Sequence, residues 1–321
     1  MIEGLRASSS PHLRQPRSIS GIMVDVCIAL LPAALYGVFQ FGWNAAMVMA
    51  VSVFTAVATE VAIELIFHKP RTIHDFSAVV TGMLVGMSCP PTVPFWIPMI
   101  GSFFAIAVVK MLFGGLGYNF MNPAVTARAV LLASWPGLMT NWQFLTPAEA
   151  VASATTTSQA TPIAALHYGT ASTYGDLFLG NVAGCIGEVS KLLLLLGAAY
   201  LVIRGVIRLY TPVALLGTLF LLTWAFGGDA GLFTGDGLYA ILSGSAIICA
   251  FFMATDYTTS PVTGAGQAIM GFGVGLIIFI IRTFGAYPEG VTYALMFMNI
   301  LTPLIDRFVR PKVYGEVKQH G

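Results

Sequence analysis

Stretches of about 20 mostly apolar residues recur along nearly the whole chain, and a helix of that length spans the hydrocarbon core of a bilayer. No other feature restricts the fold as strongly. Charged residues make up only 9% of the chain, whereas soluble domains average about 25%. The chain therefore lacks the polar side chains needed to cover a water-facing surface. The sequence predicts an all-α integral membrane protein.

Ten segments are predicted to span the membrane, and two of them, the third and the fifth, are short. The third ends at Pro90-Pro91, and the fifth begins at Asn122-Pro123. Short or broken spans in transporters often mark a binding site, although ordinary short helices buried in a bundle would give the same pattern. The ten segments allow an inverted repeat of five plus five. They are 21–41, 44–67, 76–89, 94–114, 122–134, 179–204, 210–226, 237–254, 265–281 and 288–305.

The positions of the basic residues predict the orientation. With a cytoplasmic N-terminus, most of the 15 lysines and arginines fall on the cytoplasmic side, as the positive-inside rule requires. Arg128 and Lys191 lie within spans, and Arg282 alone falls outside. The cytoplasmic set is Arg6, Arg14, Arg17, Lys69, Arg71, Lys110, Arg204, Arg208, Arg307, Arg310, Lys312 and Lys318. Both termini are therefore expected in the cytoplasm.

This topology predicts five parts of the chain, of which the third is the only sizeable loop. They are a cytoplasmic N-terminal segment (1–20), a first bundle half (21–134), an extracytoplasmic loop (135–178), a second bundle half (179–306) and a cytoplasmic tail (307–321).

Several ionisable side chains lie within or near the apolar segments, where each costs roughly 2.5–3.5 kcal/mol at a helix centre unless it has a partner or a hydrated path. Glu60 and Glu64 are four residues apart and share a helix face. Their carboxylates repel each other unless one is protonated or a cation lies between them. This predicts an ion pathway or cofactor site, with hydration near the membrane boundary as the alternative. Glu188 is a further candidate for the pathway, but its spacing from Lys191 also fits a simple ion pair.

Two polar segments join apolar spans on the expected cytoplasmic side: "GGLGYNFMNPAVTARAV" (114–130) and "MATDYTTSPVTGAG" (253–266). Free amide donors and hydroxyl groups at the start of a helix form a natural anion or phosphate site. Simple capping explains the same residues, since Asn, Ser and Thr are preferred N-caps. The candidate caps are Asn122, Thr258, Thr259 and Ser260.

The four cysteines are scattered singly over four spans and form no CxxC or Cys/His cluster. They indicate small core residues rather than a zinc site or a self-contained iron–sulfur site, and no metal ligands are predicted. A net charge of +1 gives no indication of nucleic-acid binding.

Six segments, taken in order and spacing, resemble the RnfD family, the D subunits of Rnf-type ion-translocating ferredoxin:NAD⁺ oxidoreductase complexes. More distantly they resemble the B subunit of the sodium-pumping NADH:quinone reductase. The segments are "SSPHLR", "GGLGYNFMNPAV", "SQATPIAAL", "LFLGNVAGCIGEVS", "FFMATDYTTSPVT" and "FGAYPEGVTYALMFMNILTPLIDRFVRPKVYG".

The resemblance gives a role to the polar, hydroxyl-rich stretch "EAVASATTTSQATPIAAL" (149–166). Members of the family carry FMN as a phosphoester on the threonine of an S/T-x-A-T element. Here that element is Ser158-Gln159-Ala160-Thr161, so Thr161 is the expected acceptor. The family has an acidic residue six positions earlier, where this chain has Thr155. Thr155 is the alternative acceptor, because Glu149 stands six positions before it, although Ala152 then replaces the expected Ser or Thr.

The resemblance also implies one-electron transfer by flavin within a multisubunit pump for Na⁺ or H⁺ in a prokaryotic inner membrane. Implied partners are an FMN-bearing G-type subunit, iron–sulfur subunits and a flavin transferase, with no nucleic acid. A second, non-covalent flavin (riboflavin) is expected inside the bundle near Asn122, Arg128 and Asp256. The alternatives are a secondary transporter, which buried carboxylates and paired short helices also fit, and a passive membrane anchor.

Overall fold

The computed structural model describes residues 18–68, 72–141, 143–144, 157–158, 172–228, 231–285 and 289–310. These residues form helices, apart from connecting segments and one pair of two-residue strands, β1 (Gln143–Phe144) and β2 (Thr157–Ser158). The strands pair antiparallel, with Gln143 opposite Ser158. The prediction of an all-helical protein is confirmed for the described parts of the chain.

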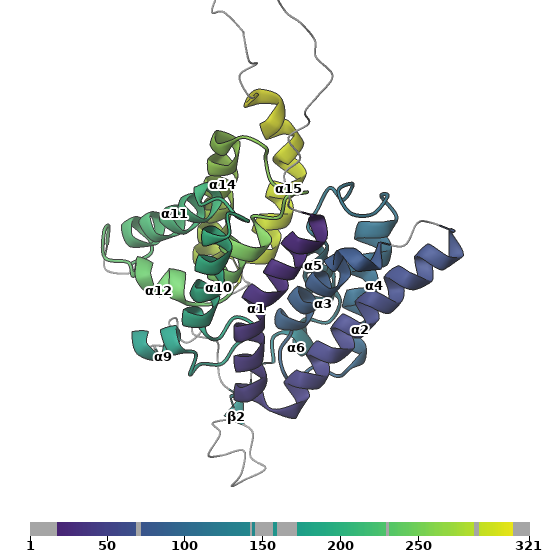
Figure 1. Cartoon of the computed structure of the whole chain (residues 1–321). Helices are drawn as coiled ribbons and strands as arrows, with labels where there is room; N and C mark the ends of the chain where they lie inside the picture. The colour runs from purple at the N-terminus through teal and green to yellow at the C-terminus, as the bar shows by residue number, and fades with distance from the viewer. Residues whose placement is uncertain are drawn as a thin grey trace, which may run out of the picture.

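The helices fall into two groups that follow the chain order, with α1 beside the second group (Figure 1). The first group consists of α1 (Ile19–Phe41), α2 (Trp43–Ile66), the short 3₁₀ helix η1 (Ile73–Asp75), α3 (Ser77–Met87), α4 (Trp96–Phe104), the π-helix η2 (Ala105–Met111), α5 (Pro123–Ser134) and α6 (Pro136–Met139). The second consists of α9 (Tyr174–Leu179), α10 (Lys191–Ile203), α11 (Tyr210–Phe226), α12 (Gly237–Leu242), α13 (Ala246–Ile248), the π-helix η3 (Cys249–Met253), α14 (Gly264–Phe284) and α15 (Val291–Phe308).

Three helices in the described part of the chain are long and apolar enough to cross a bilayer: α1, α2 and α14. They correspond to the first, second and ninth predicted spans. The predicted short spans are also observed as short helices, because α3 and α5 have 11 and 12 residues. Helices long enough to cross a bilayer therefore lie beside short and interrupted helices, an arrangement that fits a membrane protein.

Glycines at close helix crossings explain how the helices pack. On α14, Gly271 and Gly275 face α11, and a Cβ atom at either position would lie 2.5 or 2.6 Å from a carbonyl oxygen of Thr211 or Leu215. Small residues at this spacing let two backbones approach without side chains between them. Between the two groups, Gly197 of α10 meets α1, since its Cβ would lie 2.1 Å from the carbonyl oxygen of Ala29. These crossings require glycine.

The sixth predicted span, 179–204, is not one continuous helix. It is helical only from Lys191 onward, and the preceding residues 181–190 run irregularly through the interior. Gly180 has φ +107°, which ends α9, and Gly187 contacts Met87 too closely for any side chain. The backbone N–H of Gly187 donates to the carbonyl of Met87, the last residue of α3, and that of Ile186 donates to the carbonyl of Cys89 just beyond it. Glycine content and these long-range hydrogen bonds prevent a regular helix here.

Candidate functional site

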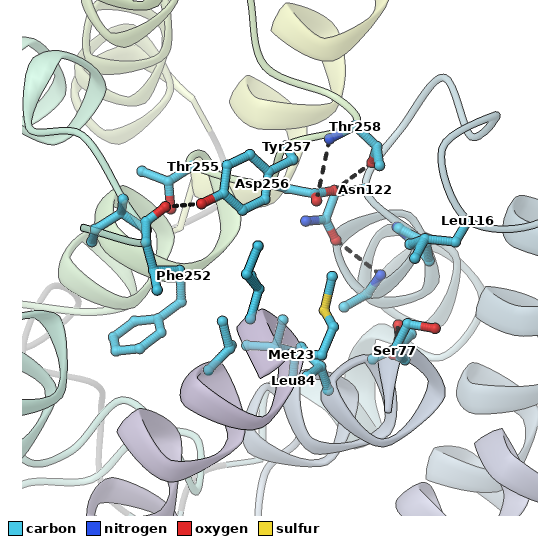
Figure 2. A pocket seen from close by; sticks show the side chains of 18 of the residues that line it. Met23, Ser77, Leu84, Leu116, Asn122, Phe252, Thr255, Asp256, Tyr257 and Thr258 are labelled. Atoms are coloured by element: carbon cyan, nitrogen blue, oxygen red, sulfur yellow. Dashed lines mark hydrogen bonds between the residues drawn. The ribbon is translucent and has the colours of Figure 1, made fainter. Parts of the chain in front are cut away.

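A pocket forms where the segment before α5 meets the segment after η3, so the two polar sequences predicted as a site lie together (Figure 2). An inner hollow of about 80 Å³ adjoins an outer hollow of about 620 Å³, and eight lining residues are common to both. Polar groups of the two loop segments occupy one wall, and α1 and α3 form the opposite one with mostly apolar side chains together with Ser77 and Thr81. Labelled in Figure 2 are Thr255, Asp256, Thr258 and Asn122 on the polar wall and Met23 and Leu84 opposite.

Asn122 joins the two groups of helices. Its side-chain oxygen accepts hydrogen bonds from the backbone N–H groups of Ala124 and Val125 at 3.0 and 3.3 Å, which caps α5. Its side-chain amide donates to the carbonyl oxygen of Met253 at 3.2 Å. The predicted capping role of Asn122 is therefore confirmed, and the same side chain also ties the start of α5 to the end of η3.

Asn119 presents a free acceptor beside Asn122. Its amide donates to the Met121 carbonyl at 3.1 Å and to the Thr258 hydroxyl at 3.0 Å. Its side-chain oxygen is buried and has no hydrogen-bond partner. Because a buried acceptor without a donor is costly, Asn119 carries an unsatisfied oxygen in a residue that lines the pocket.

Asp256 organises the other segment. It accepts hydrogen bonds from the hydroxyl groups of Thr258 at 2.9 Å and Thr259 at 3.3 Å. Part of its surface opens to the pocket, but protein surrounds the rest, and this burial raises the pKa of Asp256 while the threonine hydrogen bonds oppose the rise. The prediction that Thr258, Thr259 and Ser260 cap the next helix is wrong, because Thr263 caps α14 by accepting from Gly266 N at 3.0 Å.

Lys110 lines the pocket, and its ammonium group is the cation that pairs with Glu60. Its ammonium group donates to Glu60 Oε1 at 2.7 Å and to the Ser77 hydroxyl at 2.6 Å. Thr72 bridges the two carboxylates, donating to Glu60 Oε1 at 2.9 Å and to Glu64 Oε1 at 2.5 Å. Glu60 Oε2 is buried without a hydrogen-bond partner. The predicted repulsion between Glu60 and Glu64 is thus relieved by an internal lysine and a shared hydroxyl group.

Arg128 lies away from the pocket, six residues along α5 from Asn122, in a second buried cluster. Its guanidinium forms an ion pair of 2.5 Å with Glu289 Oε2 and lies 3.9 Å from Glu188 Oε2. The other oxygen of Glu289 accepts from Ser245 N at 2.7 Å and from the Ser245 hydroxyl at 2.9 Å. The cluster therefore joins α5 to the interruption between α12 and α13.

Lys191 does not pair with the Glu188 carboxylate, although their spacing in the sequence fits such a pair. Its ammonium group donates instead to the backbone carbonyl of Glu188 and to that of Gly244, the latter at 2.8 Å. Arg282 donates to the carbonyls of Ala240 and Ser243 at 2.6 and 3.3 Å. Both cations therefore satisfy carbonyl groups released by broken helices.

Four charged or polar residues of the pocket and the buried clusters are not among the predicted site residues: Lys110, Asn119, Arg282 and Glu289. The predicted topology places Lys110 near the cytoplasmic end of the fourth span, 94–114, and Arg282 in an outer loop. The available signal is a charged residue in apolar sequence, in "AIAVVKM" for Lys110 and "AYPEGV" for Glu289. The expected acceptors Thr161 and Thr155, with Ala160, lie outside the described residues. Ser158 is described only through its backbone pairing in β2.

Comparison with known proteins gives matches along nearly the whole chain. A family model described as the NQR2, RnfD, RnfE family matches residues 6–315. The chain is 46% identical to the D subunit of the proton-translocating ferredoxin:NAD⁺ oxidoreductase complex of Clostridium ljungdahlii, over 96% of this chain and 95% of that protein. It is also 46% identical to the D subunit of the Na⁺-translocating complex of Acetobacterium woodii, over 98% and 96%. The D subunit of the ion-translocating oxidoreductase complex of Halorhodospira halophila is 35% identical, over 97% and 95%.

Proposed function

The chain belongs to the NQR2, RnfD, RnfE family, and from this we propose that it is the membrane-embedded D subunit of an ion-translocating ferredoxin:NAD⁺ oxidoreductase complex. The observation that carries the proposal is 46% identity over almost the full length of two relatives with that name. The protein acts within a hetero-oligomer that includes a G-type FMN subunit and iron–sulfur subunits. It crosses a prokaryotic inner membrane with ten spans, arranged as five plus five, and both termini are cytoplasmic.

We further propose that Thr161 carries FMN through a phosphoester formed by a flavin transferase on the outer face, with Thr155 as the alternative acceptor. Support comes from the match of Ser158-Gln159-Ala160-Thr161 to the family element. The strand pair β1–β2 holds Ser158, three residues before Thr161, against Gln143. Bound flavin supplies one-electron redox chemistry, which amino-acid side chains lack.

The pocket between Asn119 and Asp256 is our proposed site for the non-covalent flavin. An isoalloxazine ring has one N–H donor flanked by carbonyl acceptors, and the free side-chain oxygen of Asn119 complements that donor. The apolar side chains that α1 and α3 contribute to the lining, Met23 and Leu84 among them, suit the flat face of such a ring. Asn119 would orient the ring edge, while Asn122 ties together the two segments that form the polar wall.

Glu60 and Glu64 are proposed as carboxylates of the ion path, with Glu188 as a further member. Support for the first two comes from the free oxygen Glu60 Oε2 and from Lys110, which contacts both Glu60 and the pocket wall. A change of charge in the pocket would change the strength of the ion pair between Lys110 and Glu60. One relative is named for H⁺ and another for Na⁺, and this chain is equally similar to both. Overall sequence identity therefore does not indicate the transported ion, and the residues of the path determine it.

In-gel flavin fluorescence tests the proposal. The chain, co-expressed with a flavin transferase and run on a denaturing gel, should give a fluorescent band at its own mass. A solute transporter or a passive anchor predicts a dark band. If the band stays dark while a known covalent flavoprotein fluoresces in the neighbouring lane, the proposal is wrong, and the chain is a transporter or a passive anchor instead.

A further inference from the structure

Glu188 has one carboxylate oxygen that no hydrogen bond satisfies. The side chain is only 4% exposed. Oε1 accepts a hydrogen bond from the backbone N–H of Cys185 at 2.9 Å, whereas Oε2 is buried without a hydrogen-bond partner. An ionised carboxylate in this environment is unfavourable unless a cation pairs with it.

Each cation near Glu188 is engaged elsewhere. Arg128 pairs with Glu289 at 2.5 Å and stays 3.9 Å from Glu188 Oε2. Lys191, at the start of α10, donates to two backbone carbonyls. Arg282, at the end of α14, donates to two others. The Cys185 thiol, which faces Arg128, donates to the Ser88 carbonyl at 3.1 Å. Among the described residues, none gives the Glu188 carboxylate a charged hydrogen-bond donor.

A small cavity of about 10 Å³ borders Glu188, and its lining includes Leu177 of α9, Lys191 and Glu289. That volume holds about one water molecule. The cavity therefore has room for one water molecule beside Glu188, between the buried cluster and Leu177 of α9.

We propose that Glu188 is an internal proton-binding site governed by Arg128. While Arg128 binds Glu289, Glu188 carries a proton as the neutral acid. When Arg128 moves to Glu188, the O–H bond breaks, the proton passes to water in the adjoining cavity and the carboxylate pairs with the guanidinium. The reverse movement takes up one proton from water. No electron is exchanged in either direction.

This inference deepens the ion-path part of the proposed function, but its test needs neither flavin nor partner subunits. The probe is the C=O stretch of a protonated carboxylic acid in the infrared spectrum of the full-length chain at neutral pH. Subtracting the spectrum of Glu188→Gln from that of the wild type should leave one such band, and that band should shift in D₂O. Glu64→Gln is the matched control, because Glu64 already accepts two hydrogen bonds from Thr72, and its subtraction should leave no such band.

A second variant tests the control by Arg128. Glu289→Gln frees Arg128 to pair with Glu188, so the protonated band should disappear although Glu188 is still present. Glu188→Asp keeps a carboxyl group at this position and should retain the band at a shifted frequency. That result would show that the band comes from this carboxyl group and that its loss in Glu188→Gln is not caused by misfolding. The proposal is overturned if the wild-type spectrum and that of Glu188→Gln coincide in the carboxylic acid region, or if the band survives unchanged in Glu289→Gln.

Discussion

Replacing Arg128 by methionine should destabilise the folded chain by about 3–5 kcal/mol, the usual cost of removing one partner from a buried ion pair. Among the described residues, the guanidinium group is the only cation that bonds directly to the Glu289 carboxylate, at 2.5 Å, and the other donors, from Ser245, are neutral. Both residues are less than 10% exposed, at 7% and 9%. Methionine fills a similar volume, so the loss arises from an uncompensated carboxylate rather than from a cavity.

Buried thiols provide the assay. Cys89, Cys185 and Cys249 are buried in the folded chain, so a fluorogenic thiol reagent reports their exposure as the temperature or denaturant concentration rises. The midpoint for Arg128→Met should fall well below that of the wild type. Arg204→Met is the matched control, because Arg204 pairs with Asp25 at 3.1 Å but its side chain is 57% exposed. Water screens that pair, and the control should shift the midpoint far less.

A double variant separates charge from packing. Glu289→Gln added to Arg128→Met removes the stranded charge and should recover part of the loss, since contacting residues couple strongly. Equal midpoint shifts for Arg128→Met and Arg204→Met, or no recovery in the double variant, would refute the view that burial makes the Arg128–Glu289 pair important.

Further predictions concern the pocket, the topology and the helix crossings. Asn119→Leu should lower the content of extractable non-covalent flavin at least several-fold, measured by fluorescence of the acid extract, while a covalent band persists; full retention would contradict the assigned role of Asn119. Ala160→Cys should react with an impermeant thiol reagent added from outside the cell, and labelling only from the cytoplasmic side would contradict the topology. Gly271→Leu should separate α11 from α14 and lower the thermal midpoint, whereas Gly217→Leu, with open space around its Cβ position, should not.

Local signals in the sequence predict individual helices better than their contacts. Pro90-Pro91 and Asn122-Pro123 mark the boundaries of α3 and α5 closely, because proline ends one helix and starts another by local sterics. The irregular segment 181–190 escapes prediction, since an apolar run with scattered glycines also fits a membrane helix. Its conformation depends on hydrogen bonds to α3, far away in the chain.

The charge clusters show the same limit. The repulsion between Glu60 and Glu64 follows from their spacing, but the cation that relieves it comes from Lys110, 50 residues after Glu60. Arg128 and Glu289 are 161 residues apart, and no local pattern relates them. Glu188 and Lys191, which local spacing does relate, do not pair through the carboxylate, because broken helices offer carbonyl groups that attract the ammonium ion more closely.

The most direct test of the proposed function is peptide mass spectrometry of the chain after co-expression with a flavin transferase. The proposal predicts that the peptide spanning 129–191 gains FMN less one water, with the added mass on Thr161. Thr161→Ala should abolish the adduct while leaving membrane insertion intact, because the loss of a single loop hydroxyl group is expected to change stability little. An unmodified wild-type peptide, from a preparation in which the transferase modifies a known substrate, would contradict the assignment of this chain as a covalent flavoprotein.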